Sequence, residues 1–145
     1  MKGIYCLLIH LPEEQEITVG SRHNIPFPRG YYAYTGSALG GLNPRINRHL
    51  RKDKKLHWHI DYLLDKAIIN DIIIAETEDR MECVLAQALL LRFEAIPGFG
   101  ASDCRCRSHL VFSTIEMNDE IMAVFGQIGV TPLLLPDLDT RVLKV

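Results

Sequence analysis

A predicted strand, a glycine-rich turn and a predicted basic helix follow one another within residues 30–55, and this succession constrains the fold more than any other segment. The strand reads GYYAYTG and is rich in the aromatic and β-branched residues that strands favour. Three glycines at its end and just beyond it predict a turn. Asn43 is a favourable N-cap and Pro44 suits the first helical position, so a helix is predicted from about residue 44 into the low fifties. The chain is therefore expected to pass directly from a sheet into a helix.

Two segments that precede the tyrosine-rich strand indicate further strands. Residues 3–11 are a nearly continuous apolar run, and residues 16–22 alternate between apolar and polar side chains. Together with residues 30–36 they are expected to form an antiparallel meander. The link HNIPFPR carries two prolines, so an extended or looped excursion is predicted between the second and third strands.

Helices and strands alternate along the rest of the chain. The expected elements are a short helix or ordered loop at HWHIDYLL, a strand over residues 67–76, a helix over 77–93 capped by Thr77, a strand over 108–115, a helix over 118–129 capped by Asn118 or Asp119, and an extended tail. The fold class is α/β or α+β, with a small, mainly antiparallel central sheet flanked by helices. Residues 1–145 are expected to form a single domain, because 145 residues with 48% apolar content suffice for one core.

The composition favours a cytoplasmic protein with no membrane contact. No apolar run approaches the length of a membrane span, and the N-terminus turns acidic without a small-residue cleavage site. The four cysteines are expected to be reduced thiols, since no export signal accompanies them.

The charges are unevenly distributed. The net charge is −2, but six Lys or Arg residues lie between Arg45 and Lys55 against one acid, Asp53. Such a cluster is what phosphate binding requires, because each neutralised phosphate releases counterions. The alternative is a solvated basic helix face.

Two tripeptides and the helices that follow them form an ordered set. Gly3-Ile4-Tyr5 and Tyr34-Thr35-Gly36 lie on predicted strands, Arg45, Arg48 and His49 lie on the basic helix, and Glu82 lies on a later helix. This set, over about residues 2–94, resembles the signature of the GIY-YIG nuclease superfamily. The later block GFGASDCRCRSHLVF resembles a poorly characterised branch of that superfamily, sometimes joined to endonuclease III-type repair glycosylases.

The resemblance implies a metal-dependent endonuclease that hydrolyses phosphodiester bonds in nucleic acid, with DNA in repair as the expected substrate and a repair glycosylase as a candidate partner. Each chemical role has a candidate residue. Glu82 would hold one Mg²⁺ or Mn²⁺ ion, Arg45 would bind phosphate oxygens, and His49 would act as a base or as the partner of one. Tyr5 and Tyr34 would project from one face of neighbouring strands and position water or phosphate.

The sequence departs from the family pattern at some points. Thr35 replaces an isoleucine, the gap between the tripeptides is longer, and the asparagine that usually follows the glutamate is missing. Its candidate replacements are Ser102, Asp103 and Ser108.

The remaining basic residues are candidates for contacts with the nucleic-acid backbone. They are Arg48, Arg51, Lys52, Arg105 and Arg107.

Cys104, Cys106 and His109, joined by His57 or His59, form a set of zinc ligands in the alternative interpretation. In the other interpretation the two cysteines pack inward, and the arginines beside them point outward. Two further functions therefore stand beside the nuclease: a catalytically weak accessory module that binds nucleic acid, and a zinc-stabilised interaction domain.

Overall fold

The computed structural model describes residues 1–20, 23–100 and 105–135. Its centre is strand β1 (Gly3–Leu11), which pairs antiparallel with β4 (Gly30–Ala38) on one side and with β5 (Ile68–Glu76) on the other. The sheet has six strands in the order β6-β7-β4-β1-β5-β8, and all of its pairs are antiparallel. The edge strands are β6 (Glu94–Ala95) and β8 (Leu133–Leu135), and β7 (Leu110–Ser113) lies between β6 and β4. The predicted α+β class, with a mainly antiparallel sheet flanked by helices, is confirmed.

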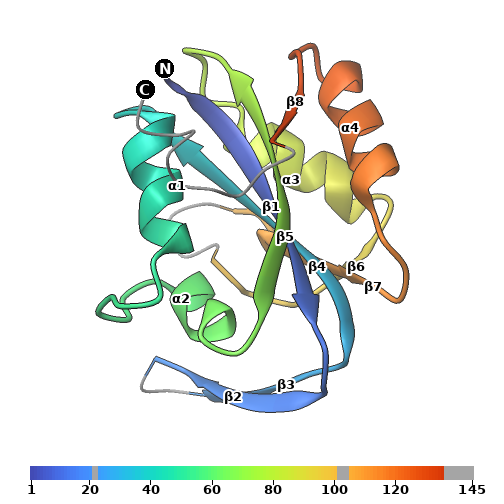
Figure 1. The fold of residues 1–145 in the computed structure, drawn as a ribbon. Helices are drawn as coiled ribbons and strands as arrows, with labels where there is room; N and C mark the ends of the chain where they lie inside the picture. The colour runs from blue at the N-terminus through green and yellow to red at the C-terminus, as the bar shows by residue number, and fades with distance from the viewer. Residues whose placement is uncertain (21–22, 101–104, 136–145) are drawn as a thin grey trace.

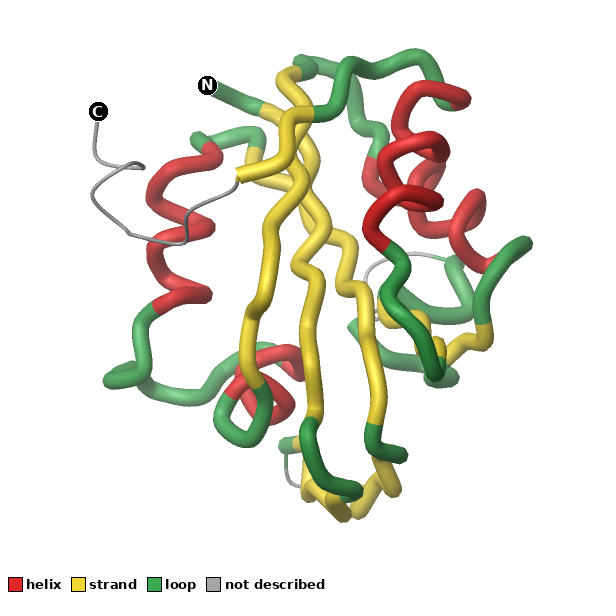
Figure 2. Tube along the Cα trace, turned by 45° about the vertical axis from the view of Figure 1, so that its right-hand side comes forward, coloured by secondary structure: helices red, strands yellow, loops and turns green. Residues whose placement is uncertain are grey.

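Two pairs of helices cover the two faces of this sheet. Helices α1 (Leu42–Leu50) and α2 (His59–Leu64) lie on one side, and α3 (Glu82–Leu90) and α4 (Asn118–Gln127) lie on the other (Figures 1 and 2). The alternation along β1 divides its side chains between two cores. Tyr5, Leu7 and Ile9 pack on the α1 and α2 side, whereas Ile4 and Leu8 pack on the α3 and α4 side.

The predicted meander of three consecutive strands is wrong. Strand β2 (Gln15–Val19) pairs with β3 (His23–Phe27) in a separate two-stranded sheet, and β4 pairs directly with β1. The proline-bearing link is extended, as expected, but it is itself strand β3. This small sheet lies at one end of the main sheet (Figure 1), and Ile17, Val19 and Phe27 pack into the core on the α1 and α2 side. Burial of these three apolar side chains accounts for the position of the hairpin.

The helices begin at residues other than the predicted caps. Gly41 is the N-cap of α1, at a φ of 129° that other residues rarely adopt, so Asn43 lies inside the helix. Helix α3 begins at Glu82 rather than near Thr77, whose hydroxyl oxygen accepts a hydrogen bond from the Asp79 amide. Met117 is the N-cap of α4. None of the helices in the described part of the chain is long and apolar enough to cross a membrane.

Candidate active site

The two tripeptides lie side by side in the sheet, and their glycines permit close packing. Tyr5 is directly opposite Gly36 in the β1–β4 register. A Cβ atom at Gly36 would overlap the Tyr5 ring, and one at Gly3 would overlap the carbonyl oxygen of Ala75 on β5. Gly36 therefore allows the Tyr5 ring to lie against β4, and Gly3 allows β5 to approach β1.

A cleft of about 730 Å³ lies beside this strand pair. Its walls come from β1, β4, α1, the start of α2, the start of α3 and the segment that precedes β7. The lining residues are Tyr5, Tyr34, Ser37, Leu39, Arg45, His57, Trp58, His59, Arg80, Glu82, Cys83, Gly100 and His109. Four of the five residues predicted for catalysis thus meet in one cleft.

The cleft lies where β7 stops pairing with β4. In the described residues, β7 pairs with residues 31–34 of β4 and leaves residues 35–38 without a strand on that side. The Thr35 amide instead donates to the His109 carbonyl oxygen at 2.9 Å. Helix α3 packs on the opposite face of the sheet from Tyr5, but its first residue, Glu82, reaches the same cleft past this open edge.

Tyr5 and His49 form a buried hydrogen-bonded pair. The Tyr5 hydroxyl lies 2.7 Å from Nε2 of His49, and the His49 residue is only 3% exposed. Burial raises the pKa of Tyr5, with Tyr34 adding to the shift and Arg45 opposing it. Burial also lowers the pKa of His49 to about 3, assisted by the charge of Lys54. Both groups are therefore neutral near pH 7, and either tautomer of the imidazole can make this bond.

The depressed pKa of His49 predicts that stability depends on pH. The unfolded chain takes up a proton on this ring near its ordinary pKa of 6.5, whereas the folded chain does so only near 3. Because stability rises with pH wherever the unfolded state binds more protons, the free energy of unfolding should fall by up to about 1.4 kcal/mol per pH unit as the pH drops below about 6.5. His49→Gln should lose this part of the slope in urea unfolding measured between pH 7 and pH 5.

His57→Gln is the matched control. The His57 side chain is exposed, so its replacement should leave the pH dependence of the unfolding free energy nearly unchanged. The charged groups facing the His49 ring are Lys54, Asp61, Arg45 and Arg48, and all of them stay in place in both variants. An identical slope in wild type and His49→Gln would contradict the assignment.

Arg45 is held at the cleft by its neighbours. Its Nη1 donates to the Ser37 carbonyl oxygen at 3.1 Å, and its Cζ lies 4.8 Å from the centre of the Trp58 ring. Trp58 thus packs against the side chains of both Arg45 and Arg48. Tyr34 lines the same cleft, and burial together with the Glu82 charge raises the pKa of its hydroxyl, which Arg45 partly opposes.

Arg48 is engaged with the fold rather than standing free on the surface. Its two terminal nitrogens donate to the two carboxylate oxygens of Asp61, each at 2.9 Å, and the Asp61 side chain is fully buried. Asp61 also accepts hydrogen bonds from the backbone amides of His57 and Trp58. Burial alone would raise the pKa of Asp61, but the bonds from Arg48 and from these two amides hold it at about 2. This ion pair joins α1 to α2, whereas the sequence predicted only a phosphate contact for Arg48.

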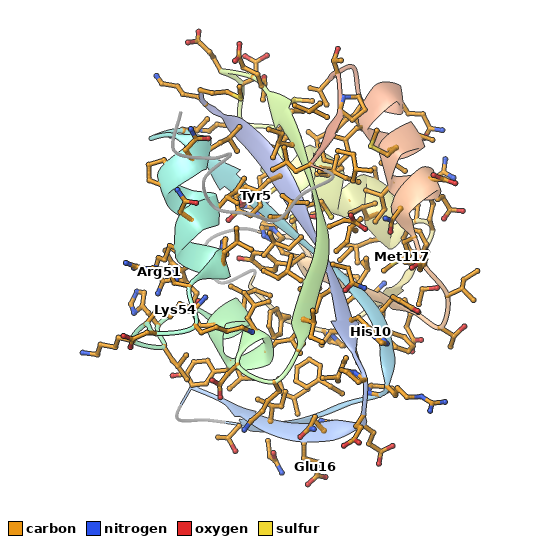
Figure 3. The ribbon with its side chains drawn as sticks, in the orientation of Figure 1. Tyr5, His10, Glu16, Arg51, Lys54 and Met117 are labelled. Carbon is orange, nitrogen blue, oxygen red and sulfur yellow. The ribbon has the colours of Figure 1, made fainter. Side chains whose placement is uncertain are left out.

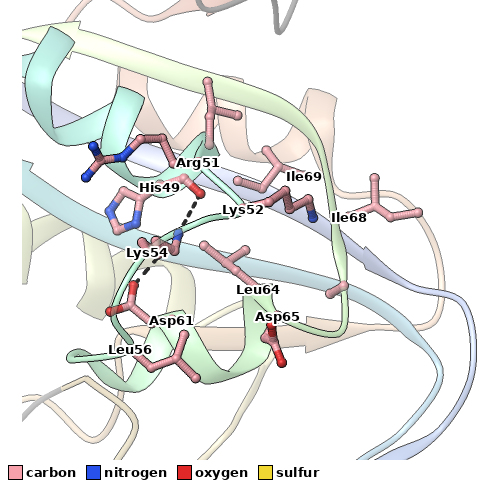
Figure 4. A pocket seen from close by; sticks show the side chains of 12 residues that line it. His49, Arg51, Lys52, Lys54, Leu56, Asp61, Leu64, Asp65, Ile68 and Ile69 are labelled. Carbon is pink, nitrogen blue, oxygen red and sulfur yellow. Dashed lines mark hydrogen bonds and ion pairs between the residues drawn. The ribbon is translucent and has the colours of Figure 1, made fainter.

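The other four residues predicted to contact nucleic acid, Arg51, Lys52, Arg105 and Arg107, are exposed. Figure 3 shows Arg51 on the outer side of α1, away from β1. Arg51 and Lys52 also line a second pocket of about 200 Å³, which is bordered by His49 and lies between the end of α1 and the start of β5 (Figure 4). Lys54 crosses this pocket, where it donates to the His49 carbonyl oxygen at 2.8 Å.

Glu82 lines the cleft beside a histidine. Its Oε2 lies 3.6 Å from Nδ1 of His109, and its side chain is 31% exposed. Burial lowers the pKa of His109 against the opposing effect of the Glu82 charge, so the ring is neutral near pH 7 and does not pair with the carboxylate as a cation. The sequence pattern indicates His109 only as a zinc ligand and does not single out Arg80, although both residues line the cleft.

The remaining predicted residues lie elsewhere. Ser108 is fully buried, and its hydroxyl bonds to the carbonyl oxygen and the amide of Leu110, so it does not replace the missing asparagine in the cleft. Ser102, Asp103 and Cys104 lie outside the described residues.

The cluster that could hold a metal ion also differs from the predicted set of zinc ligands. Cys106 and His109 come together with Cys83 from α3 rather than with His57 or His59. His59 instead accepts a hydrogen bond from the Gly100 amide at 3.1 Å.

The fold and the cleft define an α+β protein with a tyrosine-, arginine- and glutamate-lined site at the open edge of an antiparallel sheet. The chain belongs to the family described as Domain of unknown function DUF123, whose sequence model matches residues 4–130. Neither the comparison with curated proteins nor the comparison with solved structures found a match.

Proposed function

We propose that the chain is a metal-dependent endonuclease of the GIY-YIG type, which hydrolyses phosphodiester bonds in nucleic acid and acts on DNA. The observation that carries this proposal is the convergence of Tyr5, Tyr34, Arg45 and Glu82 on one cleft. These side chains come from β1, β4, α1 and α3, which are distant in sequence. With His49, which lies in hydrogen-bond contact with Tyr5, they offer a hydrogen-bond donor, a cation, a proton-accepting pair and a carboxylate, which phosphodiester hydrolysis requires.

Arg45 and Tyr34 would bind the scissile phosphate. Arg45 is held by the Ser37 carbonyl oxygen and by Trp58, so its remaining N–H groups are already oriented for phosphate oxygens. Tyr34 has a raised pKa, which keeps its hydroxyl protonated and able to donate. A cation and a donor fixed in this way stabilise the negative charge that develops on the phosphate as water attacks.

Tyr5 and His49 would take the proton of the attacking water. In this step Tyr5 accepts the proton from water while its own proton passes to Nε2 of His49, over the 2.7 Å contact between them. The lowered pKa of His49 supplies the neutral imidazole that this step needs. The negative charge of a bound phosphodiester would raise that pKa and favour the protonated product. The leaving oxygen takes its proton from solvent in the open cleft.

Glu82 would hold the divalent ion, Mg²⁺ or Mn²⁺. Among the described residues that line the cleft it is the one acid, it is partly exposed, and its neighbour His109 is neutral. One carboxylate is enough for an ion that keeps several waters and takes substrate phosphate oxygens as further ligands. When bound, the ion would polarise the phosphate and neutralise part of its charge.

The exposed basic residues would contact the rest of the nucleic acid. Arg51 and Lys52 follow α1, and Arg105 and Arg107 flank Cys106 in the segment that precedes β7. These charges would add affinity without sequence selectivity, because phosphate contacts position a nucleic acid but do not read its bases.

A second candidate is a module that binds nucleic acid without cleaving it. It is favoured by the raised pKa values of both cleft tyrosines, since neither is a phenolate near neutral pH in the free protein. The two candidates are separated by cleavage assays with a divalent ion.

Tyr5→Phe tests the proposed enzyme. Phenylalanine keeps the ring that packs on Gly36 and removes only the hydroxyl that meets His49, so the fold should be retained. Cleavage of DNA in the presence of Mg²⁺ or Mn²⁺ should fall by a factor on the order of a hundred, with DNA affinity nearly unchanged.

Tyr31→Phe is the matched control for this measurement. Tyr31 lies on β4, stacks on His10 and does not line the cleft, so its substitution should leave cleavage within about twofold of wild type. Binding without cleavage in the wild type, under every divalent ion tested, would favour the second candidate. Equal cleavage by wild type and Tyr5→Phe would remove Tyr5 from the mechanism.

A further inference from the structure

A cluster of two thiols and an imidazole lies beside the cleft. Cys83 is the second residue of α3, while Cys106 and His109 belong to the segment that leads into β7. One ligand atom from each residue, a sulfur or a ring nitrogen, lies within 4.8 Å of the others. The fold thus brings together three metal-binding side chains from two separate parts of the chain.

The distances suit a tetrahedral ion. With a zinc–sulfur bond of about 2.3 Å, two ligand atoms on such an ion lie about 3.8 Å apart. The three atoms therefore need to approach by about 1 Å at most, which side-chain rotation can supply. Cys83 and Cys106 are half-buried and His109 is buried, so the ligands are shielded without being closed off from solvent.

The donor set selects the kind of ion. Thiolate sulfur and imidazole nitrogen are the ligands that Zn²⁺ prefers, whereas Mg²⁺ takes oxygen ligands. The carboxylate proposed to hold Mg²⁺ belongs to Glu82, which is not a member of the cluster. The two kinds of ion would therefore use different side chains of the same region.

We propose that Cys83, Cys106 and His109 bind a Zn²⁺ ion, with a water or an added ligand in the fourth position. The ion would tie the first turn of α3 to the segment that precedes β7. Glu82 directly precedes Cys83 and lies 3.6 Å from the His109 ring, so the same ion would fix the position of the cleft carboxylate. Zinc binding itself does not depend on the proposed nuclease activity.

Metal content and cobalt spectroscopy of the full chain test this site. Protein purified without chelator should contain about one zinc per chain, and Co²⁺ added to the metal-free protein should produce a thiolate-to-cobalt charge-transfer band. Cys83→Ala and Cys106→Ala should each weaken zinc affinity by a factor on the order of a hundred or more. Removing a residue that only hydrogen-bonds to a metal ligand already costs tenfold to a hundredfold in affinity. Zinc should also raise the Tm of wild type but not that of these variants.

Cys6→Ala is the matched control, because Cys6 is a buried thiol of β1 outside the cluster. It should keep the zinc content and the cobalt band. Alkylation of wild type, mapped by mass spectrometry, provides a readout that needs no variant: Zn²⁺ should protect Cys83 and Cys106, whereas Mg²⁺ should not. Absence of zinc uptake, unchanged affinity in Cys83→Ala, or equal alkylation with and without Zn²⁺ would each overturn the proposal. None of these measurements uses nucleic acid, so their outcome tests the zinc site independently of the proposed nuclease activity.

Discussion

Replacing Arg48 with alanine is expected to lower the free energy of unfolding by about 2 to 4 kcal/mol, because it breaks a buried ion pair and leaves one charge without its partner. Asp61 is fully buried and receives both terminal nitrogens of Arg48 at 2.9 Å. In the variant its carboxylate would keep the backbone amides of His57 and Trp58, with Lys54 at 3.9 Å as the nearest remaining cation. The loss should therefore be large without reaching the full cost of an isolated buried charge. Urea unfolding followed by circular dichroism measures it.

Arg51→Ala is the matched control, since Arg51 lies at the end of the same helix with an exposed side chain. Its effect should stay within about 0.5 kcal/mol of zero. Adding Asp61→Asn to Arg48→Ala should recover part of the loss, because the amide removes the buried charge while its oxygen can still accept from the backbone amides. Equal stability of Arg48→Ala and Arg51→Ala would mean that the pair between α1 and α2 contributes little.

The basic segment of residues 45–55 therefore serves more than one purpose. Arg48 and Lys54 hold α1 to its surroundings through Asp61 and through the carbonyl oxygens at the end of the helix. Arg51 and Lys52 are exposed. Charge density along the sequence could not distinguish these two groups, since Asp61 meets Arg48 only once α1 and α2 both cover the same face of the sheet.

The local patterns predicted the elements better than their partners. Alternation and β-branched content correctly indicated β1, β4, β5 and β7, because these depend on neighbouring residues. The pairing of β2 with β3 depends instead on which apolar faces can be buried together, and a strand pattern does not encode this choice. The late start of α3 has a similar cause. Thr77 donates its amide to the Lys2 carbonyl oxygen, so the chain is still attached to the sheet where the pattern predicted a cap.

The candidate cleft was predicted in part from the sequence. Period-2 alternation placed Tyr5 and Tyr34 on one face, and both pack on the α1 and α2 side. The family resemblance placed Glu82 with the tyrosines, but the strand pattern did not predict its approach from the other face, which requires β7 to end early along β4. The same holds for Cys83, whose proximity to Cys106 and His109 depends on how α3 packs beside β7. Spacing along the chain identifies ligands only when they lie in one segment.

Replacing Glu82 with glutamine is expected to reduce divalent-ion-dependent cleavage by a factor on the order of a hundred or more while nucleic-acid binding is largely kept. Glutamine has nearly the same size and helix propensity as glutamate but lacks the charge that would hold Mg²⁺. Glu82 is partly exposed at the first position of α3, so the substitution should disturb the fold little. The measurement is a Mg²⁺ and Mn²⁺ titration on single-stranded, duplex and branched DNA.

Glu78→Gln is the matched control, because Glu78 is an exposed acid four positions earlier that does not line the cleft. It should cleave like wild type. Zinc content provides a second comparison: Glu82→Gln should retain the ion proposed at Cys83, Cys106 and His109, since glutamine removes none of its ligands. Loss of cleavage with zinc retained would assign the catalytic ion to Glu82. Undiminished cleavage in Glu82→Gln would place the chemistry at another site, because a nuclease that depends on this carboxylate cannot keep its rate without the charge.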